Sequence, residues 1–209
     1  MSFRFSFEDH AVDEIVKQLP IASDVSVNVC FKDQSPLIVE KNGNCATITY
    51  GRRVELFRGL GLLAEHSGEE SFFIQQKAAF KMNGVMLDCS RNGVAKVDTV
   101  KRLIRYMALM GLDMLMLYTE DTYEVPEYPY FGYMRGRYSI AEMKQIDEYA
   151  YSYGIEVVPC IQTLAHLNQI FRWRDFGECH DIDDILLIDS EEVYAFIDKM
   201  FASLANNFT

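Results

Sequence analysis

Between Gly84 and His166, short apolar runs that stop at polar residues alternate with segments in which apolar residues recur at helical spacing. This alternation restricts the fold more than any other feature of the chain. The expected strands are 85–87, 113–118 and 155–160, and the expected helices are 98–110 and 139–153. A further helix is expected over 190–204, after a long polar and aromatic loop. This order is typical of a parallel α/β fold.

Polar side chains follow each of the three expected strands. Asp88 and Arg91 follow the first strand, Glu120 and Asp121 the second, and His166 lies in the loop after the third. Because strand–helix–strand connections of this kind are right-handed, the carboxyl ends of the strands lie on the same side of the sheet. In a (β/α)8 TIM barrel, that rim holds the active site. The sequence therefore predicts that these side chains converge on one rim.

Three βα units are fewer than half of a (β/α)8 TIM barrel. Such a piece leaves two sheet edges and much apolar helix surface uncovered. We therefore expect residues 80–209 to be the N-terminal part of a longer TIM-barrel domain, an incomplete barrel made of the first three βα units. Self-association through the uncovered edges is a further expectation.

Residues 1–79 predict a separate small α+β domain that precedes the barrel. Its expected helices are 11–19 and 54–64, and its expected strands are 25–31, 46–50 and 71–75. The segment Lys41-Asn-Gly-Asn44 is a turn signal ahead of the strand at 46–50. We find no group of catalytic side chains in this part, and we expect its lone histidines, His10 and His66, to lie at the surface.

Each polar residue of the rim has a structural interpretation as well as a functional one. Arg91 could form a loop salt bridge with Asp88, or its planar guanidinium could be held by that carboxylate and directed at ligand oxygens. Glu120 and Asp121 could be solvated loop charges, or one of them could face inward with a shifted pKa. The residues alone leave these alternatives open, and they indicate a barrel enzyme that acts on a polar small molecule.

The last loop holds four further candidate residues, His166, Trp173, Cys179 and His180. His166 is either structural or an acid–base group, since it shares the rim with two carboxylates. Trp173 could stack on a sugar face or simply pack. Cys179-His180 resembles half of a metal site without the other half, so we predict no metal and no cofactor.

Charge and cysteine content exclude several classes of partner. The formal net charge of −11 disfavours nucleic acid and anionic lipid, and no apolar run approaches the length of a membrane span. The N-terminus lacks the apolar centre of a signal peptide. The cysteine count of five is odd and no CxxC spacing occurs, which indicates reduced thiols. We therefore expect a cytoplasmic protein with no nucleic-acid or membrane partner.

Taken together, the motifs resemble those of the family 20 glycoside hydrolases, the β-N-acetylhexosaminidases. The segment Asn83-Gly-Val-Met-Leu-Asp88-Cys-Ser-Arg91 is similar to the strand and Asp-x-x-Arg motif that open the family's barrel. Glu120-Asp121 is similar to the paired acids that end its second strand. The segment Pro159-Cys-Ile-Gln-Thr-Leu-Ala-His166 has the ends of the family's third motif at matching spacing. Residues 1–79 resemble the small domain that commonly precedes this barrel.

The resemblance implies a retaining mechanism in which the 2-acetamido oxygen of the substrate attacks the anomeric carbon. By match, Arg91 would hold hydroxyls of a terminal N-acetylglucosamine or N-acetylgalactosamine, and Asp88 would brace Arg91. His166, backed by Glu120, would lie beside the acid Glu and help to set its pKa. Asp121 and Trp173 complete the expected substrate-binding set.

The resemblance also implies an Asp–Glu pair that orients the acetamido group and protonates the leaving oxygen. We expect that pair after Thr209, so this chain alone is expected to be an inactive N-terminal fragment of an exo-acting enzyme. Departures from the family pattern, among them Cys160 and Gln162, indicate a divergent branch. A non-catalytic carbohydrate-binding or scaffold protein derived from such a hydrolase is the alternative. A phosphosugar isomerase or aldolase is a further alternative, disfavoured by the acidic charge.

Overall fold

The structure is a computed structural model that describes residues 1–208 as an α/β protein. Its contacts divide the chain into two compact units. The first unit comprises Met1–Gly84, Arg102–Met114 and Ala150–Glu156, and the second comprises Val85–Lys101, Leu115–Tyr149 and the residues from Val157 on. The predicted boundary between domains at 79/80 stays a prediction.

The first unit contains a five-stranded sheet with the strand order β1-β2-β4-β3-β5. The strands are β1 (Phe3–Phe5), β2 (Val25–Phe31), β3 (Leu37–Asn42), β4 (Cys45–Tyr50) and β5 (Ser71–Gln76). β1 and β4 run parallel to β2, whereas β3 is antiparallel to both β4 and β5. The predicted turn at Lys41-Asn-Gly-Asn44 joins β3 to β4, and Gly43 adopts the positive φ of +57° that favours glycine there.

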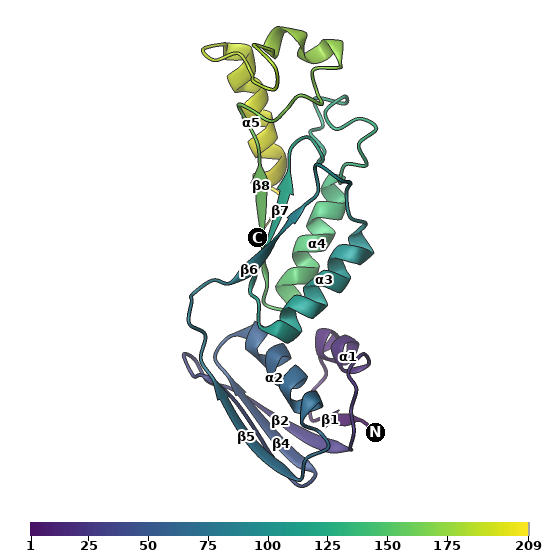
Figure 1. Cartoon of the computed structure of the whole chain (residues 1–209), viewed down its shortest axis with the longest axis vertical. Helices are drawn as coiled ribbons and strands as arrows, with labels where there is room; N and C mark the ends of the chain where they lie inside the picture. The colour runs from purple at the N-terminus through teal and green to yellow at the C-terminus, as the bar shows by residue number, and fades with distance from the viewer. Residues whose placement is uncertain (209) are drawn as a thin grey trace. The chain divides into compact units, whose positions relative to one another are not determined.

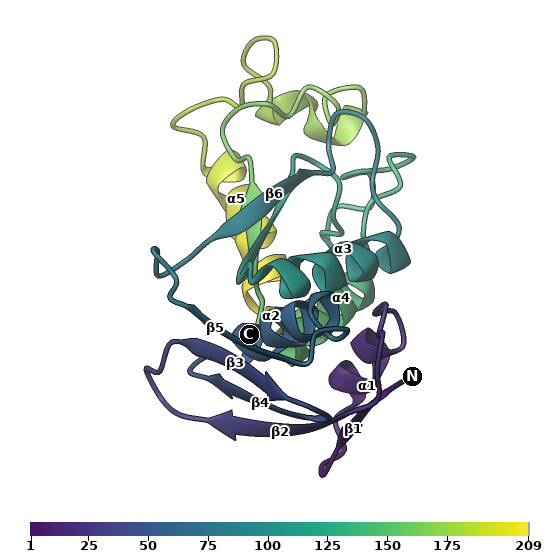
Figure 2. The same cartoon turned by 60° about the horizontal axis from the view of Figure 1, so that its bottom comes forward.

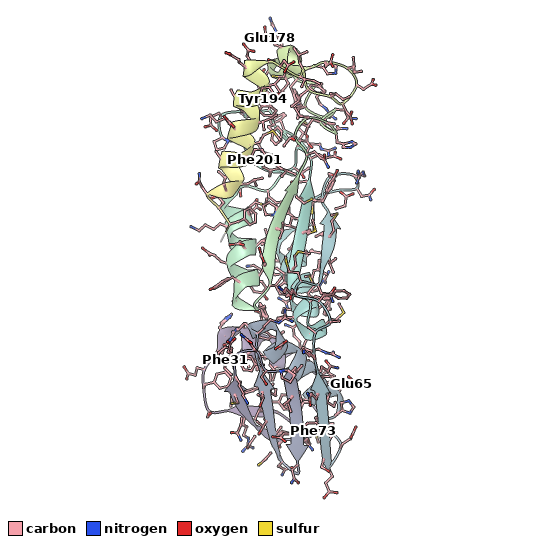
Figure 3. All side chains as sticks on the ribbon, turned by 90° about the vertical axis from the view of Figure 1, so that its left-hand side faces the viewer. Phe31, Glu65, Phe73, Glu178, Tyr194 and Phe201 are labelled. Atoms are coloured by element: carbon pink, nitrogen blue, oxygen red, sulfur yellow. The ribbon has the colours of Figure 1, made fainter. Side chains whose placement is uncertain are left out.

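Helix α2 (Arg53–Glu65) covers one face of this sheet, as Figures 1 and 2 show, and α1 (His10–Val16) lies beside it. A Cβ atom on Gly59 would lie only 2.7 Å from Ile48 Cγ2, so glycine permits the close approach of helix and sheet. The core of this unit is apolar, and its fully buried members include Val39, Ile48, Phe57, Leu60 and Leu63. Phe31 and Phe73, labelled in Figure 3, are exposed.

The three strands that the sequence predicts after residue 80 form a second sheet. Their order in this sheet is β6-β7-β8. They are β6 (Gly84–Asp88), β7 (Met114–Thr119) and β8 (Glu156–Ile161). Asp113 N donates to Asn83 O at 2.8 Å where β6 and β7 begin, and Cys89 N donates to Tyr118 O at 2.9 Å where they end. Start therefore pairs with start and end with end, so these two strands are parallel.

Helix α3 (Val97–Met110) connects β6 to β7, and helix α4 (Ile140–Ser152) connects β7 to β8 (Figures 1 and 2). A capping box begins α4, since Ser139 N donates to Glu142 Oε2 at 2.9 Å and Glu142 N donates to Ser139 Oγ at 3.3 Å. Helix α5 (Glu191–Ala205) begins at Ser190, whose hydroxyl accepts from Val193 N.

The second unit is built around buried aromatic rings, which we call the aromatic core. Its members are Tyr123, Phe131, Phe176 and Phe196. The Phe131 ring lies 5.1 Å from that of Tyr123 and 5.7 Å from that of Phe196, between ring centroids. Phe176 lies 5.4 Å from Phe196. The aromatic core therefore ties the loop after β7, the loop after β8 and helix α5 together.

The sequence missed β1, β3 and a short 3-10 helix, η1 (Arg174–Cys179). In the loop after β8, His180 and Leu186 form an isolated antiparallel bridge. Among the helices of residues 1–208, none has the length and apolar character needed to cross a membrane.

Candidate substrate-binding site

A polar pocket of about 300 Å³ lies within the second unit, where the segments after β6, β7 and β8 meet. Its lining residues are Ser90, Arg91, Glu120, Arg135, His166, Asn168, Gln169 and Asp184. The structure thus brings together Arg91, Glu120 and His166, which follow three different strands. Parallel strands with their carboxyl ends on one side account for this convergence.

Asp88 organises the turn that carries Arg91. Its Oδ1 accepts hydrogen bonds from Ser90 N at 2.9 Å and Ser90 Oγ at 2.8 Å, and its Oδ2 accepts one from Arg91 Nη1 at 2.8 Å. The Arg91 side chain is nevertheless 59% exposed, and its guanidinium lies over the Tyr118 ring at 5.2 Å. The salt bridge that the sequence posed as one alternative is therefore present, and it leaves the Arg91 side chain exposed. Asp88 holds one edge of the guanidinium while Arg91 still lines the pocket.

The same contacts set the charge states of this pair. Burial by itself raises the pKa of Asp88, but the hydrogen bonds from Ser90 and Arg91 outweigh it and lower the pKa to about 2. The hydrogen bond to Asp88 is the main cause that raises the pKa of Arg91. Both groups are therefore charged at neutral pH.

Replacing Ser90 with alanine is expected to raise the pKa of Asp88 from about 2 towards its ordinary value of 3.8, because the hydroxyl that stabilises the carboxylate is lost. Carboxyl ¹³C NMR during a pH titration measures this. Since the pKa in the folded state is the lower one, the contribution of Asp88 to stability is complete above about pH 4. It is lost as the pH falls towards 2. An unchanged titration in Ser90→Ala would show that the hydroxyl does not act on Asp88.

Glu120 is fixed between two neighbours in the pocket. Tyr118 OH donates to Glu120 Oε1 at 3.4 Å, and Arg91 Nη2 lies 3.9 Å from the same oxygen. Gln162 Nε2 in turn donates to Tyr118 OH at 3.1 Å. Glu120 is therefore positioned from β7 and from the end of β8, and its carboxylate helps to hold Arg91.

His166 pairs with a different carboxylate from the one that the resemblance implies. Its Nδ1 lies 3.1 Å from Asp184 Oδ2, so Asp184 takes the place expected for Glu120. The backbone explains this correction, because Leu167 N donates to Asp184 O and Leu186 N donates to Leu164 O, at 3.2 and 2.9 Å. These bonds place the two segments side by side.

Asp121 is buried, with only 2% of its surface exposed, and it does not line the pocket. The expected role of Asp121 in substrate binding stays a prediction. Arg135 Nε lies 3.2 Å from Asp121 Oδ1, an ion-pair distance at which the N–H does not point at the oxygen. Burial raises the pKa of the Asp121 carboxyl, and the charge of Arg135 opposes that shift.

Arg135 is one of the pocket residues that the sequence reasoning missed. Its Nη2 donates to Ser90 O at 2.6 Å, so it links Asp121 to the turn that carries Arg91. The available signal was a pair of arginines, Arg135 and Arg137, in an otherwise aromatic and glycine-rich loop. A cation in such a loop needs an anionic or carbonyl partner, and here Arg135 has both.

Trp173 does not line the pocket, and its expected role in substrate binding stays a prediction. Its ring stacks on Tyr130, with 5.3 Å between ring centroids, and meets Tyr133 edge-on at 5.2 Å. Within the protein, Trp173 therefore packs against other aromatic rings, which is one of its two interpretations in the sequence analysis.

The chemistry of the pocket suits a neutral ligand that is rich in hydroxyl groups. Arg91 and Arg135 supply donors, Glu120 and Asp184 supply acceptors, and two amide side chains can do both. In residues 1–208, no group of three or more His, Cys, Asp or Glu side chains is placed to hold a metal ion.

The fold and this pocket define an α/β enzyme class in which ligands bind beyond the carboxyl ends of parallel strands. Residues 80–209 match the family model described as the catalytic domain of glycosyl hydrolase family 20. The chain therefore belongs to that family, whose members are β-hexosaminidase-type glycoside hydrolases.

Individual relatives agree with this assignment. The chain is 33% identical over 106 residues to a probable beta-hexosaminidase of Arthroderma benhamiae. The matched region covers 47% of this chain and 17% of that protein. The chain is 29% identical over 118 residues to the probable beta-hexosaminidase fdl of Drosophila melanogaster, covering 50% of this chain and 18% of the relative.

The fold is also that of solved family members. The GH20 beta-N-acetylhexosaminidase of Streptomyces coelicolor superposes with a TM-score of 0.80 at 20% identity, over 100% of this chain and 53% of that one. The chain thus spans about half the length of this solved relative and less than a fifth of the two curated relatives.

Proposed function

We propose that this chain forms the substrate-gripping part of an exo-acting β-N-acetylhexosaminidase that releases terminal β-linked N-acetylglucosamine or N-acetylgalactosamine. The observation that carries the proposal is Arg91, which Asp88 orients at 2.8 Å while its side chain opens into a pocket of hydroxyl-binding groups. Family membership supports the reaction class.

In the proposed reaction, the acetamido oxygen of the substrate attacks the anomeric carbon with retention, as an exception to the two-carboxylate scheme. Arg91 binds hydroxyls of the terminal sugar, and Asp88 and Glu120 position Arg91. The His166–Asp184 pair supplies a polar edge to the pocket. The acid that protonates the leaving oxygen and the Asp that orients the acetamido group are assigned to no residue of this chain.

The proposed layout is that of the sequence analysis. Residues 1–79 form a small domain, and residues 80–209 contribute the first three βα units of a TIM barrel. The five cysteines, Cys30, Cys45, Cys89, Cys160 and Cys179, are all free thiols, which is compatible with the cytoplasmic location that we propose.

Replacing Arg91 with alanine is expected to weaken the binding of N-acetylglucosamine by about 10- to 100-fold, because a charge-assisted hydrogen bond contributes about 1.5–3 kcal/mol. Titration calorimetry or NMR on the 209-residue chain measures the affinity. In a family enzyme that contains this segment, kcat/KM should fall by a similar factor.

Arg102→Ala is the matched control for this experiment. Arg102 is an exposed arginine on α3 that does not line the pocket, so its loss should leave sugar affinity unchanged. An Arg91→Ala effect of less than about threefold, or an equal effect of both variants, would contradict the role proposed for Arg91.

A further inference from the structure

The five-stranded sheet of the first unit has one face that α2 covers and one face that no helix of this unit covers (Figures 1 and 2). On the covered face, Leu37 and Ile48 lie next to Gly59 of α2. Side chains alternate between the two faces of a strand, so the neighbours of these residues in β3 and β4 point away from α2. Glu40 and Thr47 belong to this uncovered face, and neither is buried.

A trough of about 500 Å³ crosses β4, β3 and β5 on the uncovered face, and we call it the sheet trough. Its floor is the backbone of Ala46, Lys41 and Phe72, which are partners in the strand register. Their side chains lie on the side of α2, since Ala46 and Lys41 are buried and the Phe72 ring lies 5.1 Å from that of His66, the C-cap of α2. Its walls are two rows of register partners, one of Cys45, Asn42 and Ser71 and one of Thr47, Glu40 and Phe73.

The walls of the sheet trough offer hydrogen bonds with little charge. Asn42, Ser71 and Thr47 can each donate and accept. Glu40 is the one charged residue of the walls, whereas 24% of the whole chain is charged. Phe73 adds an aromatic ring that is 62% exposed. The walls can therefore pair with hydroxyl and amide groups while the ring covers C–H groups.

The same wall residues fit other classes of ligand poorly. None of the six is a cation, and the ammonium of Lys41 donates to Glu69 O on the other side of the sheet, so an anionic polymer would lack a partner. A single carboxylate does not supply the oxygen ligands that a hard metal ion needs. The centre of a protein interface is apolar, whereas Phe73 is the only large apolar side chain of the walls. A neutral polymer rich in hydroxyl groups remains.

We propose that the sheet trough binds a neutral polysaccharide chain, at a site in the first unit that is separate from the polar pocket of the second. The trough is open beside Phe73, because β5 is the edge strand of the sheet. At its other end, the two rows continue into Ser26 and Asn28 of β2. A chain longer than the trough can therefore pass through it, and would hold the enzyme on a polymer whose ends the pocket receives. The inference rests on the proposed function only for the choice of sugar, β-1,4-linked N-acetylglucosamine.

The test uses the soluble hexasaccharide of β-1,4-linked N-acetylglucosamine and the Arg91→Ala variant of the 209-residue chain, in which the pocket should contribute little. Phe73→Thr, made in this background, should weaken hexasaccharide binding by calorimetry about tenfold, because the bound sugar no longer covers the phenylalanine ring. Threonine keeps the preference for a strand. Circular dichroism of each variant confirms that it is folded. Added salt should leave the affinity unchanged, because a neutral ligand is not screened.

Phe31→Thr is the matched control. Phe31 is 63% exposed in the same sheet, close to the 62% of Phe73, but it does not line the trough (Figure 3). Its replacement should leave the affinity unchanged. Two exposed free thiols report the position of the ligand, since Cys45 lines the trough and Cys30 does not. Saturating hexasaccharide should slow the alkylation of Cys45, followed by mass spectrometry, and leave that of Cys30 unchanged.

Several results would overturn the sheet trough. These are equal weakening by Phe73→Thr and Phe31→Thr, equal protection of Cys45 and Cys30, or loss of binding in salt. A dimer that Phe73→Thr dissociates in sedimentation would assign the trough to a second copy of the chain instead. Hexasaccharide binding that requires Arg91 and ignores Phe73→Thr would overturn the trough and leave the proposed function intact. Binding that requires Phe73, in a chain whose affinity for N-acetylglucosamine does not respond to Arg91→Ala, would support the trough and overturn the role proposed for the pocket.

Discussion

Replacing Gly132 with alanine is expected to lower the free energy of unfolding by about 3 kcal/mol, because two costs combine. Gly132 adopts a positive φ of +65°, where a side chain is strained. In addition, its new Cβ would meet the carbonyl oxygen of Asp121, and this oxygen belongs to the backbone and cannot rotate away. The loop that carries Arg135 would therefore have to move, and sugar affinity should fall as well.

Gly136→Ala provides a control from the same loop. Gly136 has a similar positive φ of +69°, but a Cβ atom there would meet nothing within 4 Å. Its cost should be limited to backbone strain, about 1 kcal/mol. Urea unfolding of the two variants gives the comparison. If the two variants lost equal free energy of unfolding, the contact of the new Cβ with Asp121 O would add no cost.

Replacing Arg135 with methionine is expected to destabilise the fold by about 3 kcal/mol, because the buried carboxylate of Asp121 loses its cation. The same change releases Ser90 O, to which Arg135 donates at 2.6 Å, and so loosens the turn that holds Arg91. Chemical unfolding measures the first effect and sugar titration the second.

Two further variants make this result specific. In Arg137→Met, the lost guanidinium contacts backbone carbonyls of Pro129 and Phe131 rather than a carboxylate, so a smaller loss is expected. Adding Asp121→Asn to Arg135→Met should recover part of the stability, because the uncompensated charge is removed. If the double variant were less stable than the single one by the full cost of Asp121→Asn alone, the two residues would not be coupled.

The parts of the fold that sequence could predict are those with a local pattern. Strands β6, β7 and β8 are short apolar runs between turn residues, and α3 and α4 carry regular apolar spacing, so all five were found. Strand β1 was missed because it is only three residues long. Strand β3 was missed because only Leu37 to Val39 are apolar and its last buried position is Lys41, a charged residue.

The candidate site also contains some pairings that a local sequence pattern predicts and others that it does not. Asp88 and Arg91 are three residues apart, and their ion pair could be anticipated from that spacing alone. The pairings of His166 with Asp184 and of Asp121 with Arg135 depend on how long loops fold back. Their partners lie in loops that are not themselves periodic, and no local rule selects Asp184 over Glu120. Backbone hydrogen bonds between the loops decide it.

The aromatic core has a consequence for how the pocket wall opens and closes. Because Phe131, Phe176 and Phe196 come from three segments yet share one cluster, none of these segments can detach without exposing rings that belong to the others. We therefore expect the loop after β7, the loop after β8 and α5 to exchange their amide hydrogens with a common opening free energy, as a single cooperative unit. Sugar binding by the pocket would then be gained or lost together with this cooperative unit.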